Sequence, residues 1–298
     1  MNRGLAQFVK VWGLAIRPKT LFAAVTPVLL GTVLAYSHRH GAMPSAAAAF
    51  LGAIFIQIGT NLANDYWDAK KGADNENRLG PTRVTSSGLL SPSSVFIGMV
   101  IAFLIAALAG LFLISQAGWP VLVIGIVSII CGVLYTAGPF PLAYIGLGDL
   151  FAFVFFGPVA VAGTYFVQAR EMSLEAVILG FVPGSYSVVL IALNNFRDRE
   201  SDVVVNKKTL AVRFGDTFAR AEIAVFCFIP AVIPFVLGFR GFSIPVAVAC
   251  SSVAFIGGMA ICRSVYKIRD KRAVNALFPR TGLVSVLVTI LLSLFLLR

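Results

Sequence analysis

Long apolar runs alternate with short polar connections along most of the chain. A bilayer core about 30 Å thick requires about 20 apolar residues of helix, and nine runs meet that length approximately. They cover residues 20–37, 44–66, 92–115, 119–136, 146–168, 173–196, 217–238, 243–263 and 281–298. The pattern therefore predicts an all-α integral membrane protein with nine transmembrane helices in one polytopic domain, residues 1–298.

The composition supports a membrane protein. Of 298 residues, 58% are hydrophobic and only 12% are charged, whereas about a quarter are charged in soluble domains. The net charge of +11 would suggest nucleic acid in a soluble protein, but in a membrane chain basic residues first report topology and lipid contact. We therefore expect membrane lipid, and no nucleic acid, as a partner.

The basic residues predict an orientation. With nine spans, 20 of the 24 Lys and Arg residues lie on the side of the amino terminus, and only Arg39, Arg170, Arg240 and Arg298 lie on the other. By the positive-inside rule, the amino terminus and the long basic loops face the cytoplasm, and the carboxyl terminus faces outward.

The scarce acidic residues are clustered on that cytoplasmic side. Seven of the thirteen follow the second and sixth spans: Asp65, Asp68, Asp74, Glu76, Asp198, Glu200 and Asp202. If the helices continue, Asn61, Asn64, Asp65 and Asp68 share one side of the first, because they are three or four residues apart. Asn194, Asp198 and Asp202 form a stripe on the second. The duplication suggests two related four-helix halves, spans one to four and five to eight, whose clusters converge on one cavity.

These side chains suit a hard cation and a diphosphate. Carboxylate and amide oxygens favour Mg²⁺, which shares its coordination shell with phosphates. Basic residues that follow each cluster are suited to neutralise the remaining phosphate charge: Lys70, Lys71, Arg78 and Arg83, then Lys207, Lys208 and Arg213. The four cysteines form no CxxC pair, and His38 and His40 alone are too few for a soft-metal site.

Two aspartate motifs carry a family resemblance. NDxxD at 64–68 and DxxxD at 198–202 resemble the UbiA superfamily of intramembrane prenyltransferases. The surrounding segments 64–74, 80–92 and 194–215, together with 12–31 and 146–168, resemble its menaquinone branch, the 1,4-dihydroxy-2-naphthoate polyprenyltransferases. Many superfamily members have an acid where this chain has Gly72, and relatives often carry a basic residue in the connection 137–145, which here has none.

The resemblance implies a fold and a reaction. The fold is a nine-helix bundle around a central cavity that opens to the cytoplasm and to lipid, in a bacterial-type inner membrane. The substrates are a polyprenyl diphosphate and 1,4-dihydroxy-2-naphthoate, which are joined with loss of CO₂ during menaquinone biosynthesis. The prenyl tail requires an apolar tunnel, to which some of the 25 Phe residues are suited.

The resemblance also assigns roles to residues. Two Mg²⁺ ions are expected at Asn64, Asp65, Asp68, Asp74, Asp198 and Asp202. The diphosphate is expected at Lys71, Arg78, Arg83, Lys208 and Arg213, and substrate-orienting amides at Asn61, Asn194 and Asn195. Asp65, Asp68, Asp198 and Asp202 are the expected catalytic acids, and Asp149 is either a base for a phenolic proton or the structural partner of a cation.

Other functions fit less well. Within the superfamily, the acceptor could instead be a benzoate, homogentisate, an isomeric dihydroxynaphthoate, a haem precursor or a lipid alcohol, and the donor could be phytyl or geranylgeranyl. A cation-coupled transporter would place acids near the bilayer midplane on broken helices, whereas these acids lie at one border beside basic loops. A purely structural scaffold does not explain the duplicated motif.

Overall fold

The computed structural model describes residues 3–72, 79–239 and 243–297, and the described chain is helical. Its helices follow one another in the order α1 (Arg3–Ile16), η1 (Pro18–Thr20), α2 (Phe22–Ser37), α3 (Met43–Lys70), α4 (Pro92–Ala117), α5 (Trp119–Leu134), α6 (Gly148–Val154), η2 (Phe155–Val159), α7 (Ala160–Ala169), α8 (Leu174–Val204), α9 (Leu210–Gly238), α10 (Ile244–Lys267), η3 (Lys271–Ala276) and α11 (Leu277–Leu296). The all-helical fold class is therefore as predicted.

The described helices include seven that are long and apolar enough to cross a membrane, and an eighth if the bent pair 6–20 and 22–37 is one span. The predicted span 119–136 forms α5, an apolar helix of only 16 residues. Each of the nine predicted segments contains a helix, but the count of nine spans is not confirmed, because α5 is short for a bilayer about 30 Å thick.

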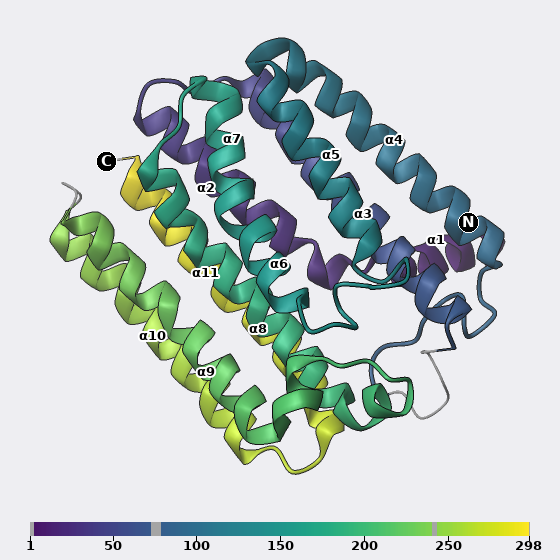
Figure 1. Ribbon diagram of the computed structural model, residues 1–298. Helices are drawn as coiled ribbons and strands as arrows, with labels where there is room; N and C mark the ends of the chain where they lie inside the picture. The colour runs from purple at the N-terminus through teal and green to yellow at the C-terminus, as the bar shows by residue number, and fades with distance from the viewer. Residues whose placement is uncertain (1–2, 73–78, 240–242, 298) are drawn as a thin grey trace.

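The helices form a bundle (Figure 1). In this view α4 and α5 lie along one side, α9 and α10 lie along the other, and α2, α6, α7, α8 and α11 lie between them. The middle of the bundle holds a large core cluster to which α2, α7, α8, α9, α10 and α11 contribute. Two further core clusters pack beside the acidic segments, one that includes Phe196 of α8 and one that includes Leu62 and Ala63 of α3.

Helices α3 and α8 extend beyond the predicted spans. The predicted spans end at residues 66 and 196, whereas α3 continues to Lys70 and α8 continues to Val204. The described acids of the two clusters, Asp65, Asp68, Asp198, Glu200 and Asp202, are therefore helical, so residues four apart do share a side of each helix.

Glycines bring the α6–η2–α7 segment against α8. A Cβ atom on Gly180 would lie 2.6 Å from Pro158 Cα, and one on Gly184 would lie 2.6 Å from the Phe153 carbonyl oxygen. Only glycine allows this approach without a shift of backbone. The close packing fixes the start of α6, where Asp149 is buried.

Candidate active site

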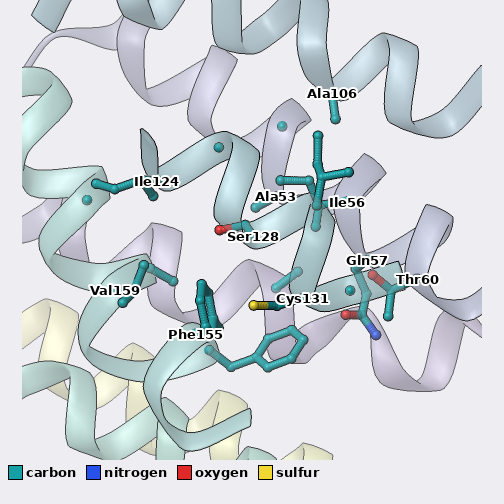
Figure 2. Close-up of a pocket in the computed structure, with 18 of the residues that line it drawn as sticks. Ala53, Ile56, Gln57, Thr60, Ala106, Ile124, Ser128, Cys131, Phe155 and Val159 are labelled. Atoms are coloured by element: carbon teal, nitrogen blue, oxygen red, sulfur yellow. The ribbon is translucent and has the colours of Figure 1, made fainter. Parts of the chain in front are cut away.

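A large apolar cavity opens inside the bundle. Its volume is about 510 Å³, and it is lined by α2, α3, α4, α5, α6, η2, α7 and α8. Figure 2 shows part of the lining, in which Ile56, Phe155 and Val159 provide apolar surface beside Gln57 and Thr60. Such a cavity suits a hydrocarbon chain.

A small polar pocket adjoins the large cavity. Its volume is about 100 Å³, and its lining includes Asp68, Arg83, Asp198, Asp202 and Lys207. The two cavities share five lining residues: Arg17, Asn64, Tyr135, Ile191 and Asn194. The acidic ends of α3 and α8 thus meet at one polar pocket, at the mouth of an apolar one.

Asp65 holds the segment that follows the first cluster. Its Oδ1 atom accepts a hydrogen bond from the Thr85 backbone N–H at 2.9 Å, and its Oδ2 atom accepts one from Val84 at 3.2 Å. The side chain is buried, at 1% exposure, and Asp65 does not line the small pocket. In this geometry both oxygens of Asp65 serve to anchor residues 84–85.

Asp68, three residues after Asp65 in α3, does line the small pocket. Its Oδ2 atom lies 3.3 Å from Arg83 Nη2, and its Oδ1 atom accepts a hydrogen bond of 3.0 Å from the Tyr144 hydroxyl. Asn64, four residues earlier, accepts a hydrogen bond of 3.0 Å from the Thr136 hydroxyl. The α5–α6 connection therefore approaches the first cluster through side chains without charge.

Lys71 contacts the α5–α6 connection, but it is exposed and lines neither cavity. Its Nζ atom donates a hydrogen bond of 2.7 Å to the Thr136 carbonyl oxygen, and it lies 4.8 Å from the centre of the Tyr144 ring. Desolvation of the ammonium lowers the pKa of Lys71 below its usual value, and the Asp68 carboxylate partly opposes that shift.

The second cluster is organised by a buried arginine. Arg197, at 2% exposure, donates to both oxygens of Asp198, at 2.8 and 2.6 Å. It also donates to Asn194 Oδ1 at 2.8 Å and to Asn275 Oδ1 at 2.8 Å. Asn275 in turn donates to the Leu79 carbonyl oxygen at 2.9 Å, so this network joins α8 to η3 and to the segment after the first cluster.

Asp202 lies one turn beyond Asp198 and is also buried. Its Oδ1 atom lies 3.5 Å from Lys207 Nζ. Its Oδ2 atom is buried and accepts no hydrogen bond from the part of the chain that the structure describes. A buried carboxylate oxygen in this state is costly unless a ligand or cation satisfies it.

Asp149 and Asn195 form a buried pair behind the pocket. The Asn195 side-chain nitrogen lies 3.5 Å from each oxygen of Asp149, and Asn195 lines the small pocket while Asp149 does not. Tyr135 lines both cavities, and its phenolic hydroxyl is a hydrogen-bond donor at neutral pH.

Several predicted residues lie elsewhere. Lys208 and Arg213 are exposed and do not line the small pocket, and Arg213 donates to the backbone oxygens of Lys208 and Ile145. Asn61 lines the large cavity and donates to the Ile16 carbonyl oxygen at 2.9 Å. Asp74 and Arg78 are outside the described residues.

The sequence placed Lys207 among the cations that follow the second cluster but not at the diphosphate, and its patterns missed three other groups at the site. Lys207, rather than Lys208, lines the pocket, and Arg17, Tyr135 and Tyr144 come from the α1–α2 break and the α5–α6 connection. For Lys207 the signal was present, since it adjoins the second motif. The other three are brought to the site by tertiary folding alone.

The pocket has the chemistry of a hard-cation site. Within the described residues, no three His, Cys, Asp or Glu side chains lie close enough together to hold a metal ion by themselves. The pocket instead combines the carboxylates of Asp68 and Asp202, including the buried Oδ2 atom of Asp202, with amides at Asn64 and Asn194. This all-oxygen set fits Mg²⁺ that completes its shell with water and phosphate oxygens.

The fold and the site define a multi-pass integral membrane protein with a polar pocket at the mouth of an apolar cavity. The sequence profile of the UbiA prenyltransferase family matches residues 24–296. The chain therefore belongs to the UbiA prenyltransferase family.

Individual relatives agree with this membership. The chain is 30% identical to a 1,4-dihydroxy-2-naphthoate octaprenyltransferase of Haemophilus influenzae, over 97% of this chain and 96% of the relative. It is 37% identical to the enzyme of that name from Mycobacterium tuberculosis, over 78% and 79% of the two chains. The fold is similar to the structure of a UbiA homolog from Archaeoglobus fulgidus bound to DMAPP and Mg²⁺, with a TM-score of 0.66, 12% identity, and coverage of 96% and 98%.

Proposed function

We propose that this enzyme transfers a polyprenyl group from a polyprenyl diphosphate to 1,4-dihydroxy-2-naphthoate, in menaquinone biosynthesis. The observation that carries the proposal is the contact between the small polar pocket and the large apolar cavity, which share Asn64 and Asn194. Relatives that match the chain along most of its length bear this activity in their names.

The donor would lie across both cavities. A prenyl tail is apolar and fits the cavity of about 510 Å³, while the diphosphate fits the polar pocket. Arg83 and Lys207 line that pocket and would neutralise phosphate oxygens. The reactive allylic carbon then falls at the junction, beside Tyr135, Asn64 and Asn194.

Mg²⁺ would be held by Asp68, Asp202 and Asn64, with Asp198 and Asn194 beside them. When bound, it supplies charge that neutralises the diphosphate as a leaving group. Both oxygens of Asp198 already accept hydrogen bonds from Arg197. To bind the expected second ion, Asp198 would have to give up one of these hydrogen bonds. We retain two ions, and Asp65 as a ligand, as predictions.

The residues around the junction would control the chemistry. The allylic C–O bond breaks with its electron pair going to diphosphate, and a carbon of the acceptor ring bonds to the allylic carbon. The carboxylate of the acceptor leaves as CO₂, and its bonding pair returns to the ring. Apolar walls exclude water, which would otherwise trap the allylic cation. Asp149 is the proposed base for a phenolic proton. It lies behind the pocket, in contact with Asn195, which lines the pocket.

The membrane arrangement is part of the proposal. We propose a single polytopic domain with nine spans, of which α5 is the shortest. We also propose two related halves, spans one to four and five to eight. The second span of each half, α3 or α8, ends in an aspartate cluster. The charge distribution supports a cytoplasmic amino terminus, cytoplasmic acidic clusters and an outward carboxyl terminus. Both substrates would then reach the site from the cytoplasm or the lipid.

The test uses purified protein in detergent or nanodiscs. Asp68→Ala and Asp198→Ala are compared with wild type for Mg²⁺-dependent joining of a polyprenyl diphosphate to the naphthoate. Asp270→Ala is the matched control, because Asp270 is exposed and does not line either cavity. We expect a loss of at least about 100-fold for the two site variants and near-normal turnover for the control. Near-normal turnover in both site variants would contradict the metal assignment.

A further inference from the structure

Arg17 occupies an unusual place between the two cavities. It lines the polar pocket, and of the described residues that line the large cavity it alone is charged. Its side chain belongs to the break between α1 and α2, rather than to either aspartate motif. A cation at the wall of an otherwise uncharged, mainly apolar cavity favours an anionic ligand there.

The backbone at Arg17 is held in an uncommon conformation. Its φ and ψ angles are 52° and 68°, in the left-handed region, which a residue other than glycine adopts at an energetic cost. Asn61 stabilises this bend, because its side chain donates to the Ile16 carbonyl oxygen at 2.9 Å and to Thr20 Oγ1 at 3.3 Å. Thr20 in turn donates to the Arg17 carbonyl oxygen through its backbone N–H and its hydroxyl, at 2.9 and 3.0 Å.

The diphosphate has other cations available. Arg83 and Lys207 line the polar pocket but not the large cavity, and Lys71 lies beside Asp68. The α5–α6 connection, residues 135–147, contains no Lys or Arg, so it contributes no positive charge to the junction. Arg17 is therefore the cation on the tail-cavity side of the reacting carbon, where the acceptor ring would enter.

We propose that Arg17 binds the carboxylate of an aromatic acid acceptor at the junction of the two cavities. A guanidinium matches a carboxylate with two parallel hydrogen bonds, which fix its orientation. The acceptor hydroxyls then face Tyr135 and the amides of Asn64 and Asn194. Asn61 acts as a positioning residue that holds the Arg17 backbone. Once the carboxylate leaves, the product no longer pairs with Arg17, which favours its release. The inference rests on the proposed function for the identity of the acceptor, but not for the binding chemistry.

The test measures binding without turnover. The affinities of wild-type protein for 1-hydroxy-2-naphthoate and for 1-naphthol, which lacks the carboxylate, are measured by calorimetry in the absence of a prenyl donor. The same measurement is made with Arg17→Gln and Arg17→Lys. Lys19→Gln is the matched control, since Lys19 lies in the same break but is exposed and lines neither cavity.

We expect wild type and Lys19→Gln to prefer the carboxylate by about 10-fold to 100-fold, the value of a charge-assisted hydrogen-bonded pair. Arg17→Gln should remove this preference and leave 1-naphthol binding unchanged, and Arg17→Lys should retain part of it. Retention of the full preference in Arg17→Gln would overturn the proposal, as would an equal loss of both ligands.

A second arm separates the acceptor from the donor. Geranyl diphosphate affinity, measured with Mg²⁺, should be the same in wild type and Arg17→Gln. Weaker donor binding with an unchanged naphthoate preference would assign Arg17 to the diphosphate and overturn the proposal. If the protein prefers the carboxylate through Arg17 but does not prenylate 1,4-dihydroxy-2-naphthoate, the proposed acceptor is wrong while this binding assignment stands.

Discussion

Arg197 and Asp198 are consecutive in the chain and form a two-point ion pair, with Nε to Oδ1 at 2.8 Å and Nη2 to Oδ2 at 2.6 Å. The Arg197 side chain is 1% exposed and that of Asp198 is 14% exposed. Neighbouring residues on a helix normally point about 100° apart, so the pair requires the arginine to curl back along α8. Its other donors reach Asn194 and Asn275, so Arg197 links α8 to η3, and Asn275 extends the network to the Leu79 carbonyl oxygen.

Replacing Arg197 should destabilise the protein strongly. Arg197→Met leaves Asp198 and two amides without their buried donor, and we expect a loss of about 3 kcal/mol in the free energy of unfolding. Arg199→Met is the control, since the Arg199–Asp216 pair is 37% and 36% exposed and should contribute about 1 kcal/mol or less. Thermal unfolding in detergent measures both, and equal losses would show that the buried network is not stabilising.

Asp65 should act on the loop that carries Arg83. Asp65→Ala removes the acceptor for the Val84 and Thr85 N–H groups, so the segment 83–85 should open more often and the KM for the diphosphate should rise. Arg83 is buried, at 9% exposure, and we expect trypsin to cleave after it several-fold faster in the variant. With Asp270→Ala as control, unchanged cleavage in Asp65→Ala would show that this anchor does not hold the loop.

Lys71 should set an alkaline limit to activity. Because desolvation lowers its pKa, the folded protein loses this positive charge at a lower pH than a free lysine does. The charged form is disfavoured by folding, so stability increases as pH rises through the folded pKa, while any activity that depends on the charge declines over the same window. Lys71→Arg stays charged, and its alkaline limb should therefore move to higher pH. Superimposable profiles would remove Lys71 from the reaction.

The size of the large cavity should limit the prenyl chain. Gly125 lines it, and a Cβ atom there would have no neighbour within 4 Å, so the side chain of Gly125→Leu extends into open space. We expect the variant to lose activity with long donors while retaining it with geranyl diphosphate, measured as the ratio of kcat/KM values. Gly13→Leu is the control, since Gly13 has similar space but does not line the cavity. An unchanged ratio would place the tail elsewhere.

The sequence alone predicted the helices and the acids that meet. Apolar runs identify membrane helices because, in lipid, each span must satisfy its backbone polar groups by hydrogen bonds within the helix. Spacing of three and four residues places Asn64 and Asp68 on one side of their helix. The ends of α3 and α8 were misjudged, since charged residues terminate an apolar run without terminating a helix. The apolar run 119–136 does not reveal that α5 has only 16 residues, and the π-helical break at Gly157 and Pro158 carries little hydropathy signal.

The partners of the predicted residues required the structure. Tyr144 reaches Asp68 across 76 residues, and Asn275 reaches the Leu79 carbonyl across 196, separations at which a single sequence carries no periodic signal. Arg17 adjoins a proline in a basic amino-terminal segment, so its sequence context resembles that of a topology signal. Its place at the cavity depends on the bend between α1 and α2.

We propose that a polyprenyl chain and 1,4-dihydroxy-2-naphthoate are joined at the junction of the two cavities. The most direct measurement is mass spectrometry of the product formed when purified protein, Mg²⁺ and a polyprenyl diphosphate meet an equimolar mixture of this naphthoate, 4-hydroxybenzoate and homogentisate. We predict one dominant product, with the mass of the prenylated naphthalenediol after loss of CO₂, and none without Mg²⁺. A dominant product from either of the other acceptors, or none from the naphthoate, would show that 1,4-dihydroxy-2-naphthoate is not the acceptor.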